Sequence, residues 1–99
     1  MRIERNGNRI GVYPEGRIDT VTAPQFAAEM EQALADAEEL KLDFSELSYI
    51  SSSGLRVVLM AAKTMARQGS MCIVNVSEEV YEILETTGFT GICDVEMKS

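Results

Sequence analysis

The chain alternates strand-like and helix-like segments along most of its length, and this alternation constrains its fold more than any other feature. Two short strands, expected at 3–5 and 9–15, flank the turn-forming trio Asn6-Gly7-Asn8. A helix, a strand, a second helix, a strand, a short helix and a last strand follow. Two strands followed by αβαβαβ predict one α/β domain over residues 1–99. We expect a mixed, mostly parallel sheet of about four to five strands, with an N-terminal hairpin and about three to four covering helices.

Local signals set the expected boundaries of these segments. Thr22 is predicted to cap the first helix, because Gln25 stands three residues on, as in a capping box, and Pro24 falls in the first turn. The second helix is expected to run to about Gln68 and to end at Gly69. Its apolar residues nearly encircle it, which predicts burial on two sides and contact with a neighbouring helix or a partner protein. The remaining expected features are a loop at 16–21, strands at 40–44, 71–76 and 92–95, and a short helix between Ser77 and Gly88.

Charge and hydropathy exclude several classes of function. The 99 residues carry a formal net charge of −7, which disfavours binding to nucleic acid and to anionic membranes. The longest apolar stretch, 57–62, is far shorter than the roughly 20 residues that cross a bilayer, and the N-terminus has no apolar signal segment. We therefore expect a cytoplasmic protein without membrane insertion.

The residues that usually carry catalysis are sparse. The chain has no histidine, and Cys72 and Cys93 are expected to be buried free thiols rather than a disulfide or a metal site. Asp19 and Asp43 are candidates for a carboxylate pair, but nothing in the sequence brings them together. Phosphate-loop and dinucleotide motifs are absent. We expect no enzymatic activity, no cofactor and no metal.

One turn concentrates the remaining polar chemistry. Before the second helix stand, in succession, Ser51, Ser52, Ser53, Gly54, Leu55 and Arg56. One serine here can be a simple N-cap, which needs no further function. A single cap does not require three hydroxyls, however, and Arg56 in the first turn opposes the helix dipole unless it holds an anion. A helix N-terminus accommodates phosphate well, so a phosphoserine is the sharper hypothesis.

With those residues in view, the chain resembles the STAS domain family, specifically the bacterial anti-sigma factor antagonists. The resemblance covers nearly the whole chain in collinear order. It is carried by Gly16-Arg17-Ile18-Asp19, Thr22-Ala23-Pro24, Leu42-Asp43-Phe44-Ser45, Ile50-Ser51-Ser52-Ser53-Gly54-Leu55-Arg56, Gly69 and Glu85-Thr86-Thr87-Gly88-Phe89. Many members have Asp where this chain has Ser51, and some have Gly where it has Arg56.

The resemblance implies a phosphorylation switch and its partners. Ser52 matches the serine that an anti-sigma factor with serine kinase activity phosphorylates, and Ser51 is the alternative acceptor. The unphosphorylated form would bind the anti-sigma factor and release a sigma factor, and a metal-dependent serine phosphatase would reset the switch. Asp19 would assist docking or orient the hydroxyl, beside a partner-binding turn at 51–56. The alternative is a constitutive interaction module in a lipid or anion transport system; a weak homodimer is left open.

Overall fold

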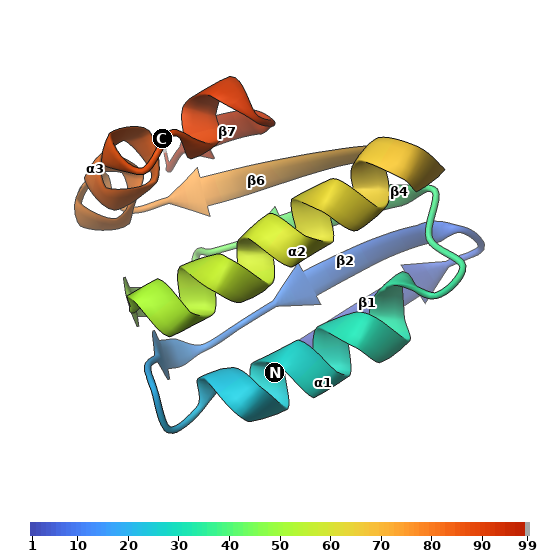
Figure 1. Cartoon of the computed structure of the whole chain (residues 1–99), viewed down its shortest axis with the longest axis horizontal. Helices are drawn as coiled ribbons and strands as arrows, with labels where there is room; N and C mark the ends of the chain where they lie inside the picture. Colours follow the sequence, from blue (N-terminus) through green and yellow to red (C-terminus); the bar gives the residue numbers. More distant parts are fainter. Residues whose placement is uncertain (99) are drawn as a thin grey trace.

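The computed structural model describes residues 1–98 and contains a five-stranded mixed sheet with three α-helices (Figure 1). The strands in chain order are β1 (Arg2–Asn6), β2 (Arg9–Tyr13), β3 (Gly16–Ile18), β4 (Glu39–Asp43), β5 (Leu47–Ile50), β6 (Ser70–Val76) and β7 (Asp94–Met97). The helices are α1 (Ala23–Leu34), α2 (Ser52–Gln68) and α3 (Glu78–Thr86), with a short 3-10 turn, η1 (Phe89–Gly91). The predicted α/β class, hairpin and sheet are confirmed.

The main sheet has the strand order β1-β2-β4-β6-β7. β1 and β2 pair antiparallel as a hairpin, and every other pairing in this sheet is parallel. In β2 and β4, buried Ile10, Val12, Leu40 and Leu42 alternate with polar or small residues, which is the period-2 pattern of strands covered on one face. α1 and α2 lie side by side on that covered face (Figure 1).

α1 buries one apolar stripe of its surface. Phe26, Met30, Ala33 and Leu34 face the core between α1, α2 and the sheet. α2 buries a wider surface, as predicted, because it contacts both α1 and the strands. The predicted end of α2 at Gln68 and the predicted short helix after Ser77 are also confirmed. The Ser77 hydroxyl caps α3 and accepts from Val80 N–H at 3.3 Å.

A second, two-stranded sheet corrects the expected loop at 16–21. Its first strand, β3, pairs parallel with β5, a segment for which the sequence predicts no strand. Ile18 pairs with Ile50, and both residues and Leu47 of β5 are buried. A three-residue strand that begins with Gly16 has too little hydrophobic pattern to be recognised locally, and only its distant partner identifies it.

Three other expectations are wrong in detail. The Thr22 hydroxyl makes no capping bond in α1 but donates to Arg17 C=O at 3.1 Å, so the predicted capping box does not form. The last strand is shifted by two residues to Asp94–Met97, because residues Phe89–Gly91 form a turn that moves its start. Cys72 and Cys93 are free but only half-buried, since each lies beside the edge strand β7.

All three helices begin at the same edge of the main sheet. The strands β2, β4 and β6 end at this edge, on the left of Figure 1, and the segment after each of them leads into a helix that begins there. Because β2, β4 and β6 run parallel, the chain leaves each of them at the same edge before it forms the next helix. The serine turn at the start of α2 and the loop before α1 therefore meet at one end of the molecule.

Candidate functional site

The first serine of the turn is the helix cap. Ser51 has extended backbone angles of φ −88° and ψ 174°, and its Oγ accepts from Gly54 N–H at 3.3 Å. The residue is half-buried between β5 and α2. The simple capping role therefore belongs to Ser51.

The second serine is in a different environment. Ser52 is the first residue of α2, is exposed, and projects from the end of the helix that carries unpaired N–H groups. Ser53 is half-buried. Of the three hydroxyl groups, that of Ser52 is the most open to a modifying enzyme, and the helix dipole favours a negative charge near it.

Gly54 holds the turn close to the second sheet. A Cβ at this position would lie 2.6 Å from Ile18 Cγ2 and 2.8 Å from Ile50 Cγ1. Both distances are far below van der Waals contact, so a larger residue would push α2 away from β3 and β5. The glycine that follows the serines is thus a packing requirement that fixes the position of the helix start.

Asp19 is brought next to the serine turn by strand pairing. Ile18 pairs with Ile50, and Ser51 N–H donates to Ile18 C=O at 2.8 Å, so Asp19 directly follows a residue bonded to the turn. Its carboxylate accepts from Val21 N–H and Thr22 N–H, each at 3.0 Å. These bonds, led by the one from Thr22, hold the pKa of Asp19 below its usual value. Asp19 is therefore an ionised residue that organises the loop beside the serines.

Leu55 and Arg56 differ in burial. Leu55 is half-buried and packs against the core. Arg56 is exposed, and the ion pairs found within residues 1–98 are Arg2–Glu4 and Arg9–Glu39, which do not include it. Its guanidinium is one turn beyond Ser52 on the helix surface and has no carboxylate partner within the described chain.

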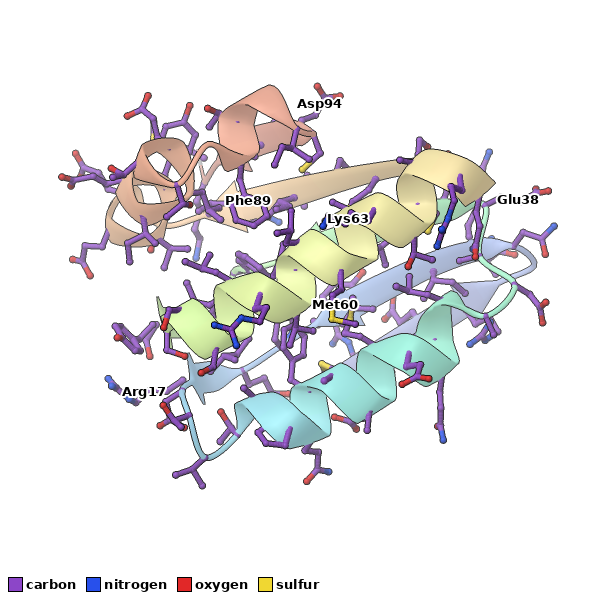
Figure 2. All side chains as sticks on the ribbon, in the orientation of Figure 1. Arg17, Glu38, Met60, Lys63, Phe89 and Asp94 are labelled. Atoms are coloured by element: carbon purple, nitrogen blue, oxygen red, sulfur yellow. The ribbon has the colours of Figure 1, made fainter. Side chains whose placement is uncertain are left out.

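Sequence reasoning missed a cation–π pair at the same end of the molecule. The Arg17 guanidinium lies 4.4 Å from the centroid of the Tyr49 ring, and the two residues are paired across β3 and β5. Figure 2 shows Arg17 at the end where α1 and α2 begin. The residues are 32 positions apart, so only the strand pairing reveals that they form one exposed surface beside the turn.

The carboxylates of Asp19 and Asp43 are used separately. Asp43 is 8% exposed and is the buried charged residue of the core at the end of β4. It accepts from Ser45 N–H at 3.0 Å and from Asn75 Nδ2 at 2.9 Å. Asn75 has a φ of 56°, at the irregularity between β6 and β7. Asp43 thus fastens the end of β6 to the loop that leads into β5 and the serine turn.

We expect Asp43→Ala to lower the free energy of unfolding at pH 7 by about 2–3 kcal/mol, because two donors to a charged acceptor lose their partner. Burial raises the pKa of Asp43, but the bonds from Ser45 and Asn75 outweigh it, so the net pKa lies below its usual 3.8. The stabilisation is complete above the unfolded-state pKa and is lost as the pH falls through the lower folded-state pKa. Urea unfolding of wild type and Asp43→Ala at neutral pH and below pH 3.8 measures this effect. The difference in free energy of unfolding between the two proteins should be smaller in acid. Asp36→Ala, at an exposed position, is the control. If Asp43→Ala lowered the free energy of unfolding by no more than Asp36→Ala does, this role of Asp43 would be contradicted.

Within residues 1–98, no group of three or more His, Cys, Asp or Glu side chains is arranged to hold a metal ion. None of the helices in that part of the chain has the length and apolar character needed to span a membrane.

The chain is similar in sequence to one protein family and to named bacterial proteins. The sequence profile of the STAS domain matches residues 1–98. The anti-sigma-B factor antagonist of Listeria monocytogenes is 30% identical over 95 residues, which are 94% of this chain and 83% of that protein. The anti-sigma-B factor antagonist of Bacillus subtilis is 30% identical over 98 residues, covering 98% and 90% of the two chains.

Solved structures share the fold. An anti-sigma factor antagonist from Mycobacterium paratuberculosis superposes with a TM-score of 0.87 at 21% identity, over 96% of this chain and 82% of that one. The Bacillus cell fate determinant SpoIIAA in its phosphorylated form gives a TM-score of 0.75 at 19% identity, over 95% and 88% of the two chains.

Proposed function

This chain belongs to the STAS domain family, and on that premise we propose that it is an anti-sigma factor antagonist controlled by phosphorylation of Ser52. Its unphosphorylated form binds an anti-sigma factor and thereby frees a sigma factor. The observation that carries the proposal is the exposed Ser52 hydroxyl at the N-terminus of α2, in a chain 30% identical to named antagonists over nearly its full length.

Geometry supports Ser52 over Ser51 as the acceptor. Ser51 is half-buried and its oxygen is engaged with Gly54 N–H, whereas Ser52 is exposed. Modification of Ser51 would disturb a helix cap, at a cost of about 1 kcal/mol. The anti-sigma factor acts in this proposal as the serine kinase, and a metal-dependent phosphatase removes the phosphate.

The surroundings of Ser52 explain how one phosphate can act without unfolding the protein. Phosphate adds about −1.5 to −2 charges, which the N-terminus of α2 and Arg56 one turn later can accommodate. At an interface packed over the same turn, the group adds bulk and a charge that must be desolvated. The switch therefore acts on binding rather than on the fold.

The relatives also bear on the choice between the two functions that the sequence suggests. Both relatives described above are named as antagonists of an anti-sigma factor, and each aligns with more than nine tenths of this chain. This favours the antagonist function over a constitutive subunit of a transport system.

The test is phosphate incorporation by the anti-sigma factor kinase of the same organism. Wild type and Ser51→Ala should each gain about 80 Da, the mass of one phosphate, and fragmentation should place it on residue 52. Ser52→Ala should gain none and still bind the kinase, because removal of one exposed hydroxyl leaves the surface intact. Incorporation into Ser52→Ala at the wild-type level would contradict the assignment.

A further inference from the structure

The charges of the three helices are segregated. α2 carries Arg56, Lys63 and Arg67 and no acidic residue. α1 carries two glutamates and α3 carries four, and neither has a basic residue. In a chain with a net charge of −7, α2 is therefore an isolated cationic element.

These cations form one stripe with an apolar residue at its centre. Ser52, Arg56, Met60, Lys63 and Arg67 follow one another at spacings of four, four, three and four residues, and all five are exposed. At about 100° per residue, they fall within roughly 80° of the helix circumference. We call Arg56, Met60, Lys63 and Arg67 the α2 stripe. The ion pairs within residues 1–98 involve none of its cations.

Met60 lies beside a groove between α1 and α2. Met60 is 62% exposed and is the exposed large hydrophobic residue of α2. The groove has a volume of about 170 Å³ and is lined by Met30, Leu34, Val57 and Ala61 among others. Sites for small molecules usually measure about 300–1,000 Å³, so this groove suits one aliphatic side chain rather than a ligand. Figure 2 shows Met60 on the side of α2 toward α1, with Lys63 further along the helix.

We propose that the α2 stripe is the docking surface for an acidic, amphipathic helical segment of the partner protein. Acidic side chains of that segment pair with Lys63 and Arg67, and one apolar side chain enters the groove beside Met60. The stripe from Arg56 to Arg67 is about 16 Å long, which matches a helix of about 11 residues. Charge complementarity and the shape of the groove together specify this occupant.

The acidic surroundings argue against a membrane or a nucleic acid at this surface. Glu31 lies in the wall of the same groove, and α1 and α3 are acidic. An extended polyanion would meet these glutamates on either side of the narrow stripe, whereas a short segment would not.

The stripe also connects docking to the switch, and this part of the inference rests on the proposed function. Ser52 is four residues before Arg56 on the same face of α2. A phosphate on Ser52 would draw the Arg56 guanidinium and place a negative charge where the acidic segment begins. Phosphorylation would then oppose the same partner through like-charge repulsion.

The first experiment measures binding of the anti-sigma factor by calorimetry. The double variant Lys63→Glu/Arg67→Glu should bind at least about tenfold more weakly than the control Arg5→Glu/Lys98→Glu, which changes the net charge equally at exposed sites outside the helices. Met60→Ala should also weaken binding, and an increase of salt from about 0.05 M to 0.5 M should reduce the difference between the two double variants. Equal affinity of the two double variants would overturn the proposal.

The second experiment does not depend on the proposed function. An acetylated and amidated peptide of about 12 residues, with glutamates on one face and leucines on the other, is titrated into the full chain and followed by amide chemical shifts. Shifts should centre on residues 56–67 and disappear in Lys63→Glu/Arg67→Glu, and phosphatidylglycerol vesicles should produce none there. Vesicle binding at the stripe, or peptide shifts elsewhere, would overturn the inference. If the peptide binds at the stripe but no anti-sigma factor does, the proposed function fails and the docking surface stands.

Discussion

Phosphorylation of Ser52 is expected to weaken binding to the anti-sigma factor by about a hundredfold or more while the stability of the free protein stays nearly unchanged. A hundredfold is about 2.7 kcal/mol, within the range for placing an unpaired charge in an interface. In the free protein the phosphate sits on an exposed residue at a helix N-terminus, where its charge is favourable. Calorimetry of the phosphorylated and unphosphorylated protein, with urea unfolding of both, measures the two quantities.

The control for this prediction places a negative charge elsewhere. Thr90 is exposed in η1, away from the start of α2, so Thr90→Asp should bind the anti-sigma factor as wild type does. Ser52→Asp should bind more weakly than Thr90→Asp, although it supplies less charge than phosphate. A phosphorylated protein that retained full affinity, or that lost affinity only because it unfolded, would contradict a switch acting at the interface.

The fold was predictable from sequence where local patterns carry it. The stripe from Phe26 to Leu34 and the alternation around Leu40 and Leu42 are periodic signals that identify one helix and one strand without knowledge of their neighbours. The pairing of β3 with β5 has no such signal, because three residues cannot show a period and their partner lies about 30 residues away. Local hydrophobic periodicity therefore does not predict the pairing of β3 with β5.

The same distinction applies to the site. The serine turn was found because its residues are contiguous, and the structure then separates the cap, Ser51, from the exposed Ser52. The contact between Asp43 and Asn75 and the stacking of Arg17 on Tyr49 each join residues 32 positions apart. Because the partners are so far apart in the chain, no local sequence pattern predicts either contact.

Gly69 is the position where we expect the largest loss of stability from a small substitution. A Cβ here would lie 1.8 Å from the carbonyl oxygen of Glu38, a backbone atom. That carbonyl also accepts from Ser70 N–H at 3.0 Å, at the start of the pairing between β4 and β6. The amide of Gln68 donates to Leu34 C=O at 2.9 Å and Ala37 C=O at 2.8 Å, so the end of α2 is bonded to the connection it approaches.

Gly69→Ala should therefore lower the free energy of unfolding by about 3 kcal/mol or more, because no flexible side chain can move aside and the backbone at Glu38 must shift. For a domain of this size, the melting temperature should fall by more than about 10 °C. Gly91→Ala is the matched control: a Cβ there meets nothing within 4 Å, so the same substitution should change stability by less than about 0.5 kcal/mol. Thermal and urea unfolding of both variants measure the difference. The end of α2 is bonded to the connection between α1 and β4. If Gly69→Ala and Gly91→Ala had equal unfolding midpoints, the backbone of this connection would be able to move aside at no cost. Close packing against it would then not be what fixes the position of α2 over the sheet.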